Sequence, residues 1–204
     1  TARSRGLGDV YKRQQLNNHL MSINDLSFLP EPYFLNNGID DVVEYSAQNK
    51  TLIKKLIETS NLQLKDYDEV SSQIKNSLNN DNPWIRYWGL IVCSSFGSKA
   101  MENKDKINVI FENDSENLVR MRAAEFMLLN DIELSDSKIN SLLKRSNFEA
   151  EANLMLNTLA NIKTINPKYK LNLNKNVFPE NWIPPIREEN ALVNRRMNYL
   201  TENE

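Results

Sequence analysis

Apolar residues recur every three or four positions from about Lys50 to Lys163, and this period is the feature that most constrains the fold. Such spacing places side chains on one face of an α-helix, whereas a half-buried strand needs strict alternation. Short polar breaks that contain Asn, Asp, Ser or Pro separate the apolar stretches. The chain is therefore predicted to be all-α over residues 50–163.

The helices of this region form a repeat. Three of them, predicted at about 84–96, 118–129 and 148–162, superpose with offsets of 34 and 29 residues. In this superposition, four columns of residues fall at positions i, i+4, i+7 and i+8, which lie on one helical face. The residue in the second column is small in every copy, as expected where helices approach closely. The columns are Ile85, Val119 and Phe148; Gly89, Ala123 and Ala152; Val92, Phe126 and Met155; and Cys93, Met127 and Leu156.

A helix pair cannot bury its apolar face alone, so repeated pairs must stack. We therefore predict a short HEAT-like α-solenoid of about three helix pairs. A tetratricopeptide array has a similar period, but its Trp, Leu-Gly, Tyr and Pro positions are not reproduced here. The best-marked helix is expected to begin at Asp81-Asn82-Pro83, since proline is tolerated in a first helical turn, and to end at Gly97.

The segments on either side of the repeats are less regular. Residues 15–49 are predicted to be an irregular connecting segment, in which the prolines of Phe28–Leu35 favour an extended or turning path. A short helix is expected over residues 38–45. Residues 164–204 are predicted to be a tail. Its contacts with the array are expected at Phe178 and Trp182, and a last helix is expected near 188–200.

Residues 1–14 resemble, from Ser4 onward, the translation of a transposase-type sequencing adapter, which encodes DVYKRQ. We expect this segment to be an adapter artefact and exclude it from the fold, so that any signal peptide would lie upstream of the junction. The alternative is a short basic arm that contacts nucleic acid. Without the segment the chain carries 21 cations and 26 anions, a balance that disfavours nucleic-acid binding.

Composition removes several kinds of chemistry. One histidine, His19, and one cysteine, Cys93, exclude a zinc cluster, a disulfide framework and the usual Cys/His catalytic pair. No apolar run approaches the roughly 18 residues of a membrane-spanning helix. Phosphate-binding loop, nucleophile-elbow and zinc-protease motifs are missing. The thirty asparagines fit a low-GC coding sequence and are interpreted as solvated residues. We assign no catalytic residue, no metal and no cofactor.

The candidate binding residues lie in two similar strings, residues 84–89 and 118–125, and in each string an arginine follows the first column. One interpretation is a cationic, aromatic-flanked ridge on the concave surface that binds an acidic or aromatic partner. The other interpretation pairs each arginine with a loop carboxylate of the neighbouring repeat, Asp81 or Asp114, while the tryptophans fill gaps between repeats. We favour the second because the motif recurs with the repeat. The candidates are Arg86, Tyr87, Trp88, Arg120 and Arg122.

Other reactive side chains are interpreted as structural. Cys93 lies in a core column, whereas reactive cysteines need a cationic or helix N-terminal setting. His19 is expected to be solvated. Nothing fixes the geometry of the carboxylate groups as an acid–base or metal pair, so they are expected on solvated faces. These carboxylates are Asp40, Asp41, Glu44, Glu149 and Glu151.

Three strings carry a resemblance to a known family. They are Gly38-Ile39 with Val42 and Tyr45; Asp81–Leu90, which contains Arg-Tyr-Trp-Gly; and Asp114 with Val119-Arg120 and Ala123-Ala124-Glu125, of which the last is shared by many HEAT-like proteins. Together they resemble the C-terminal HEAT-like region of bacterial secreted sulfatases. The resemblance covers roughly Pro30 to Lys163. It implies a parent enzyme that cleaves sulfate esters, with a preceding α/β catalytic domain, calcium in that domain, and a periplasmic or secreted location.

The resemblance does not extend to the family's active site. The catalytic residue of the family sits in a C/S-x-P-x-R motif, and Cys93 is followed by Ser-Ser-Phe-Gly instead. The calcium ligands and the active-site histidines and lysines also lack counterparts. The fragment itself is therefore expected to be inert, and to cover one face of the parent's catalytic domain or to extend its cleft toward a sulfated glycan.

Three functions stay open at this stage. A sulfatase module predicts an apolar patch left uncovered where the catalytic domain docks. A freestanding HEAT-repeat scaffold, with a protein partner on its concave face, predicts polar outer helices at its ends. A lyase or other small enzyme predicts a closed pocket with convergent ionisable groups.

Overall fold

The computed structural model describes residues 2–166, 169–182 and 191–201, and every regular element in those ranges is helical. The predicted all-α class is confirmed. The α-helices are α1 (Ala2–Ser22), α2 (Glu31–Asn37), α3 (Val42–Gln48), α4 (Lys50–Ser60), α5 (Tyr67–Leu78), α6 (Pro83–Phe96), α7 (Lys104–Asn113), α8 (Asn117–Leu129), α9 (Asp136–Leu143), α10 (Glu149–Ile165) and α11 (Leu192–Thr201). Short 3-10 helices are η1 (Leu26–Phe28), η2 (Asn61–Leu64), η3 (Gly97–Asn103), η4 (Lys175–Val177) and η5 (Glu180–Trp182).

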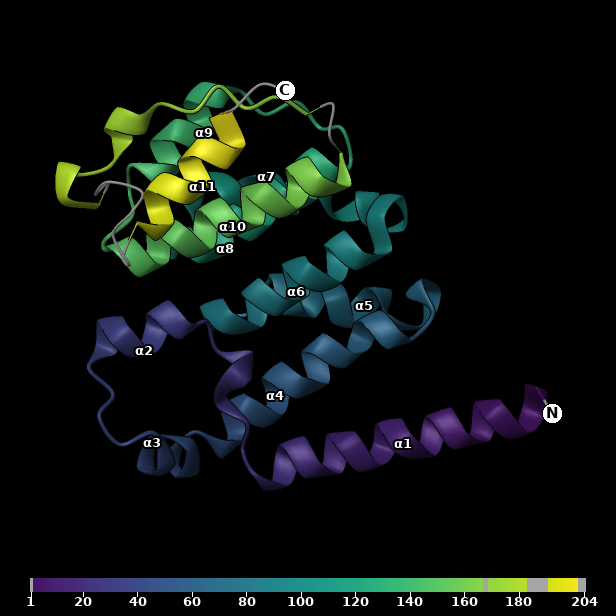
Figure 1. Ribbon diagram of the computed structural model, residues 1–204. Helices are drawn as coiled ribbons and strands as arrows, with labels where there is room; N and C mark the ends of the chain where they lie inside the picture. Colours follow the sequence, from purple (N-terminus) through teal and green to yellow (C-terminus); the bar gives the residue numbers. More distant parts are fainter. Residues whose placement is uncertain (1, 167–168, 183–190, 202–204) are drawn as a thin grey trace.

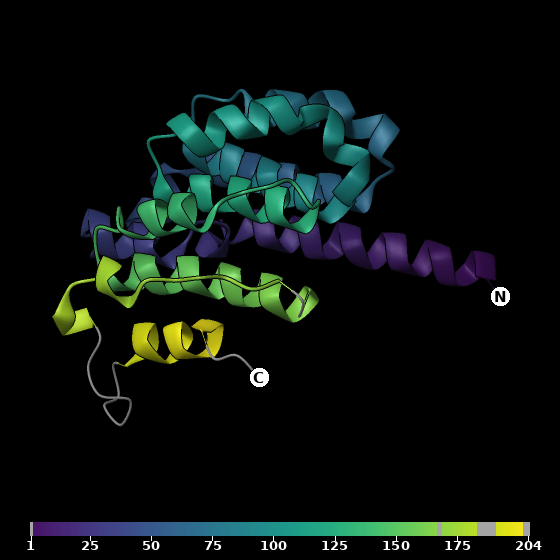
Figure 2. The ribbon, with the colours of Figure 1, turned by 90° about the horizontal axis from the view of Figure 1, so that it is seen from above.

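The longer helices form a row in which each contacts the next: α1, α4, α6, α8, α10 and α11 (Figure 1). A second layer covers part of this row, with α5 packed on α6 and α7 packed on α8 (Figure 2). Helix α9 lies against α8 and the tail element η4. Among the described residues we find no helix whose length and hydropathy suit a membrane span.

Helix α6 has the ends that its sequence predicts. The Asn82 side chain accepts a hydrogen bond from the Trp84 N–H at 2.9 Å, and Pro83 occupies the first helical position. Gly97 ends the helix with a φ of +56°, a conformation that residues with a side chain rarely adopt. At Gly89, an added Cβ would lie 3.0 Å from the Cβ of Ser77. The small second column is therefore needed where α6 crosses α5.

The four columns lie in the core, with one exception. Their members on α6, α8 and α10 are buried. Phe148 is half-buried, because it precedes α10 as its extended N-cap residue rather than lying within the helix. The shared inner face is thus confirmed for most of its members. The HEAT-like solenoid, which requires more than stacked helices, stays a prediction.

The N-terminal connecting segment is more helical than expected. The extended or turning path expected over Phe28–Leu35 is wrong in part, because helix α2 starts directly after Pro30 and holds Pro32 in its first turn. Proline is favourable there, since the N–H that it lacks has no intrahelical partner. The short helix expected over residues 38–45 is confirmed in part. Helix α3 begins only at Val42, capped by the Asp41 side chain, whereas Gly38 ends α2.

The tail follows the expected path where it is described. Phe178 is buried, and Trp182 packs partly on the core with its ring centroid 6.2 Å from that of Phe178. The last helix is confirmed as α11, which buries Val193, Met197 and Leu200 and contacts α10. Residues 183–190, and with them parts of the expected tail and last helix, lie outside the described residues.

Helix α1 begins within the segment that resembles adapter sequence. Its N-terminal half extends away from the other helices, as both views show (Figures 1 and 2). Near its other end, the Asn17 Oδ1 accepts a hydrogen bond from the Asn61 amide at 2.7 Å. The adapter origin of residues 1–14 stays a prediction, because helix formation does not test it.

Candidate functional site

Arg86, the first candidate, is occupied by an ion pair with the next repeat. Its Nε and Nη2 donate to the two carboxylate oxygens of Asp114 at 2.7 and 2.8 Å. Its Nη1 donates to the carbonyls of Asn80 and Asp81. The Asp114 side chain is only 3% exposed and that of Arg86 15%. This is the pairing that the structural interpretation of the motif predicts, and its two parallel bonds fix the orientation of the guanidinium.

Arg120, at the equivalent position on α8, makes a different contact. Its Nε donates to the carbonyl of Phe111 at 2.6 Å, and its guanidinium lies 5.8 Å from the centroid of the Phe111 ring. The expected salt bridge to a loop carboxylate is therefore wrong for Arg120. Burial and the nearby charge of Arg145 lower the pKa of Arg120.

Two further candidates, Tyr87 and Arg122, contact each other across α6 and α8. Arg122 donates from Nη2 to the Tyr87 hydroxyl and from Nη1 to the Glu125 carboxylate, both at 2.8 Å. The guanidinium also lies 5.0 Å from the centroid of the Tyr87 ring. Burial acts to lower the pKa of Arg122, but Tyr87 and Glu125 outweigh it and the pKa is raised. The charge of Arg122 is thus matched inside the fold.

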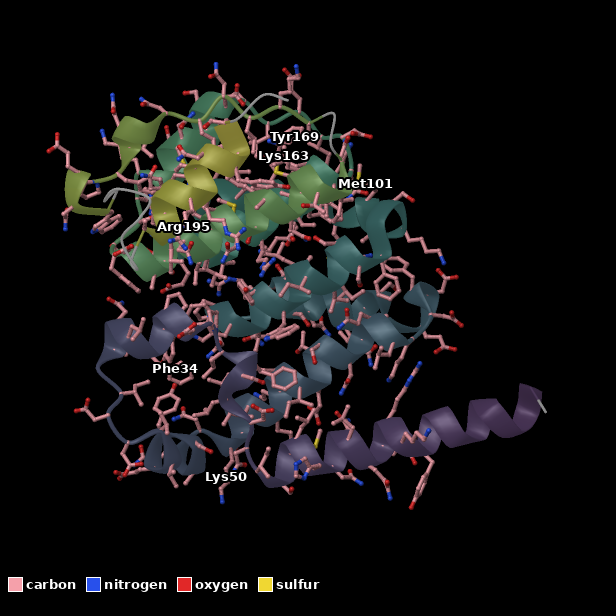
Figure 3. All side chains as sticks on the ribbon, in the orientation of Figure 1. Phe34, Lys50, Met101, Lys163, Tyr169 and Arg195 are labelled. Carbon is pink, nitrogen blue, oxygen red and sulfur yellow. The ribbon has the colours of Figure 1, made fainter. Side chains whose placement is uncertain are left out.

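The tryptophans contact the N-terminal segment. The Trp88 Nε1 donates to the carbonyl of Phe28 at 2.7 Å, and the two rings lie 5.3 Å apart. Trp84 packs edge-on against Tyr33 at 5.1 Å. Tyr33 in turn contacts Phe34, whose side chain points from α2 toward α3 and meets Tyr45 (Figure 3). The tryptophans therefore hold Phe28 and Tyr33 against α6, rather than filling gaps between repeats.

The five candidates do not form one shared surface site. Tyr87 and Arg122 meet, whereas Arg86 bonds to Asp114 in the loop before α8 and Arg120 bonds to the Phe111 carbonyl in α7. The nitrogen atoms described above are already bonded within the chain, so recognition of a ligand carboxylate by them would require breaking internal bonds. The cationic ridge therefore stays a prediction, and these internal hydrogen bonds count against it.

Cys93 and the single histidine occupy the settings that their sequence context predicts. Cys93 is buried, and burial raises the pKa of its thiol to about 12, which disfavours the nucleophilic thiolate. His19 is exposed on α1. Across the described residues, no three His, Cys, Asp or Glu side chains are grouped so that they could hold a metal ion.

One expectation about the carboxylates is wrong. Glu151 is buried rather than solvated, and it accepts hydrogen bonds from the Asn147 N–H at 2.7 Å and from the Asn117 amide at 3.3 Å. Asp41 is exposed, as expected, and caps α3. The role of Glu151 could have been inferred from its position in the first turn of a helix that lacks a side-chain cap, because a glutamate there can reach back to free N–H groups.

Sequence analysis missed a cleft of about 630 Å³ between the N-terminal segment and α10. Its walls come from η1, α2, α6, α10 and α11. Asn153 and Asn157 line it from α10, and their Oδ1 atoms are buried without a hydrogen-bond partner among the described residues. The available signal was the i, i+4 spacing of two asparagines on a mainly apolar helix. It was discounted because asparagine is abundant throughout the chain.

Comparison with known proteins adds no relative. Neither a protein family, nor a curated protein, nor a solved structure matches this chain. Function must therefore be argued from the contacts described above.

Proposed function

We propose that the chain is a non-catalytic helical-repeat module that forms the C-terminal part of a sulfatase. The observation that carries the docking role is a set of exposed apolar side chains on α2 and α3. Leu35 is 62% exposed, Val43 is 76% exposed, and Val42 is also exposed. A contiguous apolar patch that faces water is characteristic of a site for another protein surface, and the proposal takes these three side chains as part of one. In this proposal, the apolar surface of α2 and α3 packs on the catalytic domain of the parent enzyme.

The contacts of the candidate residues support a structural role. The string that most resembles the sulfatase region supplies Arg86, which pairs with Asp114, and Trp88, which holds Phe28. Both contacts position one part of the chain against another. The resemblance is thus carried by residues that maintain the shape of the module, which is what a non-catalytic region would retain.

The chemistry of the whole enzyme belongs to the preceding domain in this proposal. That domain would contain the catalytic residue, bind calcium and cleave the sulfate ester of a glycan. The parent enzyme would be periplasmic or secreted. This chain would orient that domain or extend its cleft.

The upstream genomic sequence provides the first test. We expect the open reading frame to continue upstream of Gln15 into a C/S-x-P-x-R motif. The recombinant chain alone should leave an aryl sulfate unhydrolysed. A frame that lacks the motif, or turnover by this chain, would overturn the proposal.

A binding experiment tests the docking surface. Leu35→Asp with Val43→Asp should weaken association with the separately produced catalytic domain by about tenfold or more, because apolar contacts near an interface centre carry much of its energy. Val109→Asp is the matched control, since Val109 is 51% exposed on α7 and lies outside the proposed surface. Equal losses in both variants would argue against docking through α2 and α3.

A freestanding scaffold for a protein partner is the alternative. Helix α11 favours it, because it buries Val193 and Met197 while Arg195 and Arg196 are exposed. A polar outer helix at one end of the row is what a capped array requires. This alternative predicts that the upstream frame contains no sulfatase motif.

A further inference from the structure

The pair Asn37-Gly38 is chemically distinct from the rest of the sequence. The chain has thirty asparagines, and this is the one position at which glycine follows asparagine. Glycine has no Cβ, so its backbone nitrogen can approach the amide carbon of the preceding side chain with the least obstruction. Both residues are exposed at the end of α2. The pair therefore combines the sequence and the exposure that an intramolecular reaction of an asparagine requires.

The turn that follows α2 is open to solvent. Gly38 ends the helix with a φ of +57°, in the left-handed region. A Cβ added at Gly38 would meet no atom within 4 Å, so no described segment of the chain covers this side of the turn. Water and hydroxide can therefore reach the turn from outside.

Hydrogen bonds restrain the reacting groups while α2 is closed. The Asn37 Nδ2 donates to the carbonyl of Tyr33 at 2.7 Å, and the N–H groups of Gly38 and Ile39 both donate to the carbonyl of Phe34. The last turn of the helix must open before the Gly38 nitrogen can attack the side chain. Opening costs little free energy, because α2 has only seven residues and the exposed ends of short helices fray.

We propose that Asn37 deamidates to aspartate and isoaspartate from the state in which the last turn of α2 is open. Hydroxide removes the proton of the Gly38 nitrogen, which then attacks the Asn37 Cγ and closes a succinimide ring. The bond from Cγ to Nδ2 breaks, water protonates the leaving nitrogen, and ammonia departs. Water then opens the ring, giving aspartate by attack at Cγ and isoaspartate by attack at the main-chain carbonyl. Water and hydroxide are the only other reactants.

Either product weakens the end of α2. Aspartate at position 37 places a negative charge at the carboxyl end of a helix, where the helix dipole disfavours anions, three residues before Asp40. Isoaspartate adds a methylene group to the main chain, which disturbs the bond from Gly38 to the Phe34 carbonyl. Helix α2 also carries Tyr33, which packs on Trp84, so deamidation should loosen this contact with α6. The inference does not depend on the sulfatase proposal, because it needs no second domain.

Peptide mass spectrometry of the full chain, incubated at neutral and at mildly alkaline pH, tests the proposal. Asn130 is an internal control, because its Nδ2 also donates to the carbonyl four residues earlier and the next residue, Asp131, also has a positive φ, of +55°. Asp131 differs from Gly38 in having a side chain. Asn37 should lose its amide about tenfold or more faster than Asn130, and faster at the higher pH. A rate at Asn37 no higher than that at Asn130 would overturn the proposal.

Two further variants separate the chemistry from the opening of the helix. Asn37→Gln keeps the amide but lengthens the side chain, which disfavours ring closure, so the reaction at this position should stop. Leu35→Gly favours the open helix and should speed the reaction of Asn37 about fourfold. Val43→Gly is the matched control, since Val43 is also exposed but lies on α3. Continued ammonia release by Asn37→Gln at the original rate would place the reaction elsewhere, and equal rates in the two glycine variants would refute the role of α2 opening.

Discussion

The two junctions of the helical row show how one sequence repeat leads to different contacts. The first junction joins α6 to α8 through Arg86 and Asp114. The second joins α8 to α10 through a network of neutral and charged groups. There, the Arg145 Nε donates to the Asn117 side chain at 3.1 Å, and the Asn117 amide donates to the Arg145 carbonyl at 2.9 Å and to Glu151.

The difference originates in the loops. The loop before α8 contains Asp114, which receives the Arg86 guanidinium, whereas the loop before α10 contains Lys144 and Arg145. Arg120 therefore has no loop carboxylate within its bonding contacts and turns back to the Phe111 carbonyl. The repeat determines which helix faces meet, whereas single loop residues determine which ion pairs and hydrogen bonds connect the helices.

Of the variants that test this comparison, the removal of Arg86 should have the largest effect on stability. Arg86→Leu leaves the carboxylate of Asp114 buried without its main partner, and we expect a loss of about 3 kcal/mol in the free energy of unfolding. Urea unfolding measures this loss. Adding Asp114→Asn should recover part of it, because the second change removes the orphaned charge. A loss below about 1 kcal/mol would show that the first junction does not depend on the ion pair.

The second junction should be weakened less by a comparable change. Glu151→Leu leaves the Asn147 N–H without its acceptor and removes one of the two acceptors of the Asn117 amide, and we expect a cost of about 2 kcal/mol in urea unfolding. Asn147 is exposed, so water can replace part of the lost bonding. A cost larger than that of Arg86→Leu would reverse the ranking of the two junctions.

Arg120→Leu should have a smaller effect. The change removes one hydrogen bond to a carbonyl, but it also relieves repulsion from Arg145, so we expect a loss of about 1 kcal/mol or less. The same urea measurement applies. If Arg120→Leu were as damaging as Arg86→Leu, the recurring arginines would have equivalent roles despite their different partners.

Replacing Glu116, which lies between the junctions, should have the smallest effect on stability, and that effect should depend on pH. Burial raises its pKa, and the charges of Asp114 and Glu151 add to this, so the folded chain binds the proton more tightly than the unfolded chain. Stability attributable to this group therefore falls as pH rises from the ordinary glutamate pKa through the raised one. Glu116→Gln should stabilise the chain at neutral pH and lose this advantage in acid. Unfolding midpoints across pH measure the difference, and a benefit that grows in acid would contradict the sign.

Much of the helical framework could be predicted from the sequence, whereas the candidate site could be predicted only in part. The ends of α6 follow from Asn82, Pro83 and Gly97, which act on neighbouring backbone groups. The partner of Arg86 was among the two proposed. The partners of Arg120 and Trp88 were not anticipated, because both are carbonyl oxygens, which every residue possesses and no sequence pattern marks.

The sequence by itself determined where the helices of residues 50–163 form and which of their faces are apolar, since hydrophobic spacing and capping act within a few residues. Only the tertiary structure decided how Phe28 meets Trp88, how Glu151 becomes buried, and how Asn153 and Asn157 come to line a cleft. These contacts join segments that are dozens of residues apart. Their geometry depends on how whole helices pack, a property that the local pattern of residues does not contain.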